Sequence, residues 1–346
     1  MGAEPRLPAP RTPDPRQAPA LRWGVIAPGN IAEGFAAAVA SGTRGAVVAA
    51  GSRDLERARA FTARHGGGTA YGSYEEVVAD PAVDAVYVAS PHSHHLEHAL
   101  LAVEAGKPVL VEKAFTRNAG EARRLLAAAE ARGSFVLEAM WSRFLPHYDV
   151  VRQAVGSGLL GELVEVSADH GQGLHPDGPE RLARPDLAGG ALLDLGIYPL
   201  SFAAMLLGQV DSVVAAGTLT ELGVDASDSV TLTDSAGALA RIGTTMRAPT
   251  QCRASVVGTL ARLEIERTFY QPTTVRLVDR HGHVLDRFDG GLSDGVAGLS
   301  FEAAEVARCL AAGVRESPLL PWSQTVRIME LMDEVRRQVG VRYPGE

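Results

Sequence analysis

The chain has 346 residues, which is more than one hydrophobic core usually serves, so two domains are expected. Its formal net charge of -8 argues against nucleic acid or an acidic membrane surface as the main partner. The two cysteines, Cys252 and Cys309, match no metal or disulfide spacing. They are expected to be small core residues in a reducing compartment.

Residues 1–20 alternate proline with arginine, alanine and acidic residues. This composition predicts a disordered or extended tail, because a secretory signal needs an uninterrupted apolar stretch. The longest apolar run, residues 189–208, contains Asp194 and Pro199, which favours a buried helix over a membrane span. The protein is therefore expected to be cytoplasmic.

From residue 21 to residue 141, short apolar runs alternate with helical segments. Such alternation implies parallel strands joined by right-handed crossovers, hence a doubly wound α/β sheet. Asp54 is placed to cap the second helix. The expected strands cover residues 23–27, 46–52, 84–90, 109–113 and 134–140, and the expected helices cover residues 31–41, 54–65, 94–105 and 119–132.

The turn after the first expected strand reads A-P-G-N-I-A over residues 27–32. A dinucleotide fold usually carries G-x-G-x-x-G here, so that the backbone approaches a pyrophosphate at the helix N-terminus. Only the middle glycine remains, which is also compatible with an ordinary strand-to-helix turn. Its place in the first βαβ unit favours a cofactor turn formed by Gly29, Asn30 and Ile31.

The second expected strand ends at Ser52 and Arg53, where an NAD enzyme places an acidic residue for the ribose 2′-hydroxyl. Arg57 follows one helical turn later. Arginine offers a forked donor for phosphate oxygens, so this set favours a 2′-phosphate. NADP is therefore expected, and NAD is the less favoured cofactor.

The strand over residues 109–113 ends in Glu112 and Lys113. In an open parallel sheet this end faces the ligand crevice. Lys107 and Lys113 are the only lysines in the chain, so arginine serves elsewhere as the plain positive charge. Lys113 is thus a candidate for a titratable amine, with a simple pair to Glu112 as the alternative.

Residues 91–98 read P-H-S-H-H-L-E-H, in which His94 and His98 are four residues apart. No recognised zinc spacing accompanies them and H-E-x-x-H is absent, so no metal is expected. The cluster follows the strand over residues 84–90, where Ser90, His92 and His95 would border the nicotinamide.

Four segments, taken together and in this order, resemble the Gfo/Idh/MocA oxidoreductases. They are the turn at Gly29, S-P-H at 90–92 with His95, A-G-K-P-V-L-V-E-K at 105–113 and G-G-A-L-L-D-L-G-I-Y at 189–198. E-A-M-W-S-R-F-L-P at 138–146 is similar to the dimeric dihydrodiol dehydrogenase and aldose dehydrogenase branch. One departure is Ala114, where the family has a proline after the lysine, and this is expected to affect the aim of the Lys113 amine.

The resemblance implies a Rossmann domain over residues 21–141 and an α+β domain with an open, mostly antiparallel sheet over residues 142–346. Alternating segments at 210–218, 229–247 and 254–266 fit that sheet independently. In this family the last helix, here residues 323–339, returns to the first domain. The open sheet commonly forms an oligomer interface, so a homodimer or homotetramer is expected.

The resemblance also implies the catalytic roles. Lys113 would contact the substrate oxygen and the cofactor ribose, Tyr198 would accept or donate the proton, and Asp194 would orient the sugar hydroxyls and hold the lysine. A phenol has a pKa near ~10, and a nearby ammonium lowers it by stabilising the phenolate. A purely structural Tyr198, anchoring a buried hydrogen bond, is the alternative.

An aromatic wall suits the apolar face of a sugar ring or a cyclic diol. Trp141, Arg143 and Phe144 are expected to border the substrate, and Arg181 is a further candidate contact; packing at the domain junction is the alternative for each. The expected activity is NADP-dependent hydride transfer at a secondary or anomeric hydroxyl. The alternatives are an enzyme resembling glucose-fructose oxidoreductase, with NADP bound throughout, and a non-catalytic NADP sensor.

Overall fold

The computed structural model describes residues 5–290 and 296–346, and its contacts divide the chain into two compact units. We call residues 13–144 together with 296–329 the Rossmann unit. The sheet unit comprises residues 5–12, 145–290 and 330–346. Residues 296–329 thus belong by their contacts to the Rossmann unit, whereas the sequence assigned them to the second domain.

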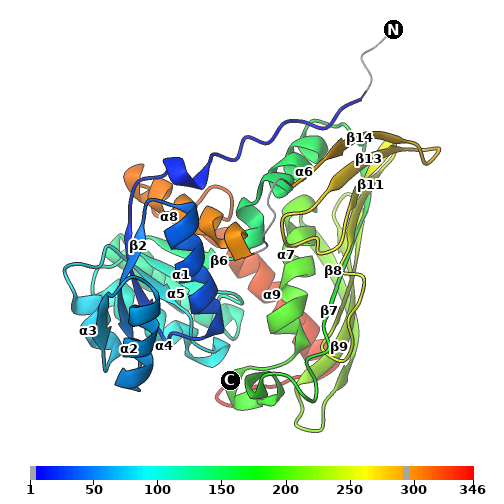
Figure 1. Ribbon diagram of the computed structural model, residues 1–346. Helices are drawn as coiled ribbons and strands as arrows, with labels where there is room; N and C mark the ends of the chain where they lie inside the picture. Colours follow the sequence, from blue (N-terminus) through cyan, green and yellow to red (C-terminus); the bar gives the residue numbers. More distant parts are fainter. Residues whose placement is uncertain (1–4, 291–295) are drawn as a thin grey trace. The chain divides into compact units, whose positions relative to one another are not determined.

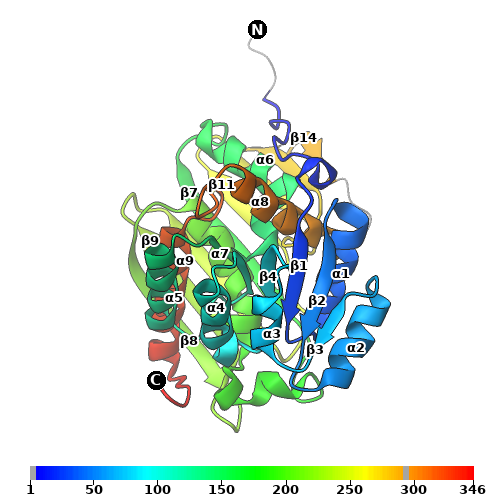
Figure 2. The ribbon, with the colours of Figure 1, turned by 90° about the vertical axis from the view of Figure 1, so that its left-hand side faces the viewer.

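The Rossmann unit contains a six-stranded parallel sheet in the order β3-β2-β1-β4-β5-β6 (Figure 2). This confirms the predicted doubly wound sheet. The order reverses between β1 and β4, and the carboxyl ends of strands at such a point bind ligands. Its strands are β1 (Arg22–Ile26), β2 (Ala46–Gly51), β3 (Thr69–Tyr71), β4 (Ala85–Val88), β5 (Val109–Glu112) and β6 (Val136–Ala139).

Helices lie on both faces of this sheet, since α1 packs against α8 and α4 packs against α3 and α5. Asp54 caps α2 as predicted, by accepting hydrogen bonds from the Glu56 and Arg57 amides. The short β3 and α3 were not predicted. The helices are α1 (Asn30–Gly42), α2 (Leu55–Arg64), α3 (Tyr74–Ala79), α4 (His95–Glu104), α5 (Ala119–Arg132) and α8 (Leu299–Ala311).

The sheet unit contains an eight-stranded sheet in the order β14-β13-β12-β11-β7-β10-β9-β8 (Figure 1). All neighbours are antiparallel except β7 and β10, which are parallel. The strands are β7 (Leu163–Gly171), β8 (Val210–Leu219), β9 (Asp225–Asp234), β10 (Leu239–Thr245), β11 (Ala254–Gly258), β12 (Ala261–Ile265), β13 (Val275–Asp279) and β14 (Val284–Phe288).

Two of the alternating segments predicted for this sheet are each a pair of antiparallel strands. Residues 229–247 fall in β9 and β10, which are joined by a turn in which Gly237 has a φ of +87°. Residues 254–266 fall in β11 and β12, which are joined by a turn at Thr259 and Leu260. Apolar residues keep alternating through a tight turn, so the periodicity of the sequence did not show where one strand ends and the next begins.

Helix α7 (Ile197–Leu206) packs on β7 and β10, with α6 (Pro146–Gly156) beside it. It continues directly from a π-helix, Leu192–Gly196. Pro199 lies in the first turn of α7, where its missing amide is tolerated. Residues 185–206 are long and apolar enough to cross a membrane, but 89% of their most apolar window is buried within the protein, as expected for a core helix.

The last helix, α9 (Trp322–Val339), begins in the Rossmann unit and ends in the sheet unit. At its start, Trp322 Nε1 donates a hydrogen bond to the Val136 carbonyl of β6 at 2.9 Å. Near its end, Gln338 accepts a hydrogen bond from the Ala215 amide of β8 at 2.7 Å. The last helix was expected to pack on the first domain, and only its first half, up to Met329, belongs to the Rossmann unit.

Residues 5–20 take the extended one of the two forms expected for the tail. They form an extended segment with one 3-10 turn, Pro15–Gln17. Asp149 accepts a hydrogen bond from the Arg11 amide at 2.6 Å, and Arg308 donates to the Pro13 carbonyl at 3.2 Å. Proline restricts the unfolded chain, so few contacts suffice to order such a segment.

Candidate active site

Lys113 stands at the carboxyl end of β5, half-buried, with its backbone held by neighbouring side chains. Its amide donates a hydrogen bond to Glu112 Oε2 at 3.2 Å, and His92 Nε2 lies 3.2 Å from its carbonyl oxygen. The peptide bond between Lys113 and Ala114, the residue that replaces the family proline, is cis. The side chains of Glu112 and His92 therefore hold the two peptide groups that flank the Cα atom of Lys113.

His95 is completely buried and lies between two carbonyl groups. Its Nδ1 is 2.9 Å from the Ala114 oxygen and its Nε2 is 2.7 Å from the Ser90 oxygen. Burial lowers the pKa of His95 to about 4, so the ring is neutral and donates to one of these carbonyls at a time. With no exposed surface, His95 does not border the nicotinamide as expected, and instead holds the backbone next to Lys113.

Buried carboxyl groups surround the same strand end. Glu112 accepts a hydrogen bond from the Tyr87 hydroxyl, and Glu138 accepts one from the Phe115 amide at 3.0 Å. Burial raises the pKa of Glu138 to about 7. Glu302 of α8 is completely buried, and neither of its oxygens has a hydrogen-bond partner among the described residues; burial and the neighbouring Glu112 raise its pKa.

Sequence reasoning missed Glu138 and Glu302. The signal for Glu138 was a carboxylate inside the apolar strand V-L-E-A at 136–139, because buried charges need a partner. Glu302 lies on the buried face of α8, and no local motif marks it.

The first turn suits a phosphate group. Gly29 is the N-cap residue of α1 and no side chain caps this helix. A Cβ added to Gly29 would meet only the Ala27 oxygen at 4.0 Å, so nothing in the chain itself excludes a side chain there. The first amides of α1, including those of Asn30 and Ile31, have no side-chain cap among the described residues, and uncapped amides at a helix N-terminus favour an anion.

The end of β2 presents two exposed guanidinium groups. Arg53 and Arg57 have no ion pair with any residue in the described ranges 5–290 and 296–346. Ser52 is buried; its hydroxyl oxygen accepts a hydrogen bond from the Asp54 amide at 3.2 Å and can still donate one. The Ser90 hydroxyl, at the end of β4, is buried and has no partner in the described part of the chain. These groups fit a phosphorylated dinucleotide.

The histidine segment brings His94, Glu97 and His98 together at the start of α4. One ligand atom from each lies within 4.8 Å of the others. Glu97 is exposed, whereas His98 is buried, and burial lowers its pKa to about 4. The expectation that no metal binds here stays a prediction.

In the sheet unit, Asp194 lies within the π-helix and is largely buried. Its Oδ1 accepts a hydrogen bond from Arg181 Nη2 at 3.0 Å, and the Arg181 side chain is 40% exposed. The structure thus brings together a predicted catalytic carboxylate and a predicted substrate contact. π-Helical turns occur frequently at functional sites.

Tyr198 lies in the first turn of α7, with its ring beside those of His170 and Tyr270. His170 Nδ1 is 3.1 Å from the Leu195 carbonyl, and Gln172 Nε2 donates to His170 Nε2 at 2.9 Å. His170 is therefore neutral with its proton on Nδ1, because a carbonyl only accepts. Sequence reasoning missed His170 near the end of β7, Gln172 just after that strand, and Tyr270 between β12 and β13.

The predicted aromatic wall is buried. Trp141, Arg143 and Phe144 are 7%, 1% and 2% exposed. Arg143 Nη2 donates to the Leu319 carbonyl at 3.2 Å and also contacts Gln324. Arg143 is thus a structural residue that ties the end of β6 to the start of α9, and it has no exposed surface for a substrate; Phe144 has almost none.

Two family models match the chain. "Oxidoreductase family, NAD-binding Rossmann fold" matches residues 21–140, and "GFO/IDH/MocA C-terminal domain" matches residues 148–264.

Similar proteins include D-xylose 1-dehydrogenase (NADP(+)) of Hypocrea jecorina, 36% identical over 94% of this chain and 93% of that protein. Trans-1,2-dihydrobenzene-1,2-diol dehydrogenase of Macaca fascicularis is 36% identical over 94% of this chain and 99% of that protein. Among solved structures, the 3-ketoreductase KijD10 of Actinomadura kijaniata, in complex with NADP and TDP-benzene, matches with a TM-score of 0.81 and 29% identity, covering 93% and 98% of the two chains. The chain belongs to the Gfo/Idh/MocA family of oxidoreductases.

Proposed function

We propose that this protein is an NADP-dependent dehydrogenase that acts on a secondary or anomeric hydroxyl of a sugar or a cyclic trans-diol. The observation that carries the proposal is Lys113 at the carboxyl end of β5, whose amide and carbonyl are held by Glu112 and His92, while His95 holds the carbonyl of the next residue, Ala114. Relatives at 36% identity act on D-xylose and on a trans-dihydrodiol, as their names state.

The Rossmann unit would hold NADP. Gly29 and the start of α1 would receive the pyrophosphate, and Arg53 and Arg57 the 2′-phosphate. When bound, the nicotinamide supplies the hydride chemistry. NAD enzymes carry an acidic residue where this chain has Ser52 and Arg53, so these two residues support NADP over NAD.

Proton transfer is assigned to Tyr198, with Lys113 contacting the substrate oxygen and Asp194 orienting the substrate hydroxyls. The rings of His170 and Tyr270 hold the Tyr198 ring, and Arg181 holds the Asp194 carboxylate. A fixed proton donor or acceptor contributes typically about 100-fold to 10,000-fold to a rate. Arg181, whose side chain is 40% exposed, is the remaining candidate for direct substrate contact, together with Trp141.

We further propose that the protein is cytoplasmic and assembles as a homodimer or homotetramer through the sheet unit. One face of its sheet is covered by α7. Arg241 of β10 lies on the opposite face, because residues alternate between the faces of a strand. Sedimentation at several protein concentrations tests this, and a monomer at every concentration would reject it.

The function is tested by following absorbance of reduced nicotinamide while the purified protein is offered NADP or NAD with a panel of aldoses and a trans-dihydrodiol. We expect reduction of NADP with one of these substrate classes. Failure with every substrate, despite confirmed NADP binding, would reject the dehydrogenase. Nicotinamide absorbance that persists through desalting would instead indicate a tightly bound cofactor.

A further inference from the structure

The two glycines that precede the π-helix are enclosed by other parts of the sheet unit. A Cβ on Gly189 would clash with the backbone oxygens of Arg181 and Leu182, and a Cβ on Gly190 would clash with the Asp225 carboxylate. Gly190 also has a φ of +113°, which side chains rarely adopt. The backbone at Gly189 and Gly190 therefore takes a conformation that only glycine fits, and we call this dipeptide the Gly189-Gly190 step.

Asp225 caps this helix from a different element. It is completely buried at the start of β9, and its Oδ2 accepts a hydrogen bond from the amide of Leu192, the first residue of the π-helix. The first amides of a helix lack partners within it, and a carboxylate there also interacts favourably with the helix dipole. Asp194 follows two residues after the capped amide.

Asp228 lies against Asp225 and is also buried. Burial and the neighbouring Asp225 raise the pKa of Asp228 far above its ordinary value. Two buried carboxyl groups in contact keep one proton between them, because both cannot ionise. Burial raises the pKa of Asp225 as well, while the hydrogen bond from the Leu192 amide lowers it, so the two carboxyl groups titrate as a pair.

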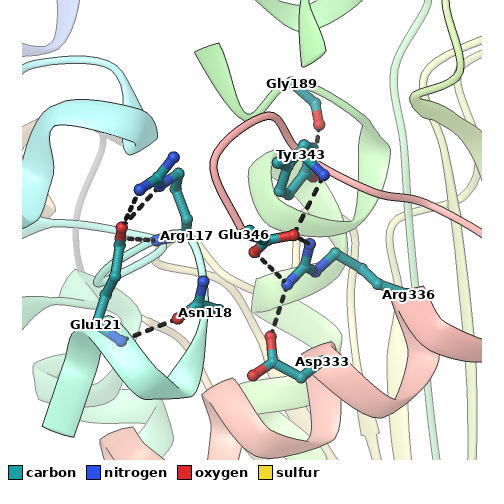
Figure 3. A network of polar contacts seen from close by, with 8 residues as sticks. All are labelled: Arg117, Asn118, Glu121, Gly189, Asp333, Arg336, Tyr343 and Glu346. Atoms are coloured by element: carbon teal, nitrogen blue, oxygen red, sulfur yellow. Dashed lines mark hydrogen bonds and ion pairs between the residues drawn. The ribbon is translucent and has the colours of Figure 1, made fainter. Parts of the chain in front are cut away.

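The C-terminal segment also contacts Gly189 (Figure 3). The buried Tyr343 hydroxyl donates a hydrogen bond to the Gly189 carbonyl at 2.7 Å. Arg336 lies over the Tyr343 ring, with its CZ atom 4.6 Å from the ring centroid, and donates to Glu346 at 2.9 Å. Glu346 in turn accepts a hydrogen bond from the Tyr343 amide at 3.2 Å.

We propose that Asp225, supported by Asp228, and Tyr343 are positioning residues that fix the Gly189-Gly190 step and thereby place Asp194 and Tyr198 for catalysis. This inference rests on the proposed function, because it assigns a purpose to the same π-helix. Neither residue touches substrate or cofactor in this account; each acts through the backbone of the π-helix.

The test compares Asp225→Ala with a matched variant in the same strand. Asp234 is also buried in β9 and accepts three backbone hydrogen bonds, from Gly208, Ala236 and Ala238, at a hairpin that carries no candidate residue. A displacement of a catalytic group by 1 Å costs about 100-fold in rate. We therefore expect kcat to fall at least about tenfold in Asp225→Ala, with KM for NADP unchanged, and to stay within about twofold in Asp234→Ala.

Two conservative variants separate positioning from folding. Asp228→Asn replaces the second carboxyl group with a neutral group of the same shape and leaves the Asp225 cap in place, so kcat should stay within about twofold of wild type. Tyr343→Phe removes one hydroxyl and no packing, and kcat should fall about threefold to tenfold. Tyr343→Phe keeps the test decisive if Asp225→Ala does not fold.

Hydrogen exchange measured by mass spectrometry on the same variants needs no turnover, so it separates this inference from the proposed function. Amides 189–200 should exchange faster in Asp225→Ala and Tyr343→Phe than in Asp234→Ala. Unchanged exchange there, or equal kcat in Asp225→Ala and Asp234→Ala, would overturn the inference. An inactive wild type with faster exchange in the variants would reject the dehydrogenase and still support the positioning.

Discussion

His170 Nδ1 donates a hydrogen bond to the Leu195 carbonyl at 3.1 Å, and the same imidazole ring lies 5.4 Å from the ring of Tyr198. One residue at the end of β7 therefore holds both the backbone of the π-helix and the side chain proposed to move the proton. We expect His170→Phe, which keeps an aromatic ring but removes the donor, to lower kcat about tenfold, the equivalent of one hydrogen bond of about 1.4 kcal/mol. Steady-state kinetics at saturating NADP measure this, and a kcat equal to wild type would contradict it.

We expect the cofactor preference to depend on the exposed guanidinium groups of Arg53, after β2, and Arg57, in α2. Arg53→Ala and Arg57→Ala should each raise KM for NADP about tenfold or more, because a hydrogen bond to a charged group contributes about 1.5–3 kcal/mol. KM for NAD, which lacks the 2′-phosphate, should change little. Equal effects on both cofactors would show that these arginines do not receive the 2′-phosphate.

Arg181 and the neighbouring Arg184 provide a matched pair. Arg181 donates to Asp194 at 3.0 Å, whereas Arg184 pairs with Asp186 on the surface. We expect Arg181→Ala to lower kcat/KM for the substrate about tenfold, because a largely buried carboxylate loses a charged hydrogen-bond donor. Arg184→Ala should leave kcat/KM unchanged, since exposed ion pairs contribute little. Similar losses in both variants would contradict the role of Arg181.

Glu138 makes stability depend on pH. Burial raises its pKa from 4.5 to about 7, so the folded protein holds a proton that the unfolded chain releases above pH 4.5. The free energy of unfolding therefore falls as pH rises from 4.5 to about 7, by at most about 3 kcal/mol for this group. Glu138→Gln keeps an oxygen that accepts the hydrogen bond from the Phe115 amide, and glutamine does not titrate, so its stability does not fall with pH through this residue.

Urea unfolding at pH 5 and pH 8 measures the difference between Glu138→Gln and wild type. The stability of Glu138→Gln relative to wild type should increase with pH. A difference that is constant between the two pH values would mean that Glu138 titrates normally in the folded protein.

Local sequence was sufficient for most of the Rossmann unit. The apolar runs of β1, β2, β4, β5 and β6 and the cap at Asp54 are contiguous signals, and the predicted strands and helices agree with the structure within a few residues. β3 has only three residues, Thr69–Tyr71, which is too short for a periodic pattern. The breaks within 229–247 and 254–266 were missed because apolar alternation continues across tight turns.

The candidate site divides in the same way. Gly29, Arg53, Lys113 and Asp194 are visible in contiguous motifs. Asp225 and Tyr343 are not, because the backbone groups they bind lie 33 and 154 positions away in the sequence. We predicted that His95 contacts the cofactor because a polar residue after a strand often binds a ligand. In the structure His95 is completely buried, and its Nδ1 contacts the Ala114 carbonyl.

The central claim is that the amine of Lys113 is required for turnover and not for folding. Lys107 is the matched control, since its Nζ donates to the carbonyls of Asp80 at 3.0 Å and Val83 at 2.6 Å. Lys107→Met should lower the Tm and leave kcat unchanged.

The most direct measurement is kcat and the Kd for NADP in Lys113→Met and Lys107→Met, with the substrate that the wild type uses. We expect kcat to fall about 1,000-fold or more in Lys113→Met. A loss of this size is typical when a proton-transfer contact and a charge-stabilising donor are removed. The Kd for NADP should stay within about tenfold of wild type. Turnover by Lys113→Met close to that of wild type, or an equal loss in Lys107→Met, would contradict the central claim.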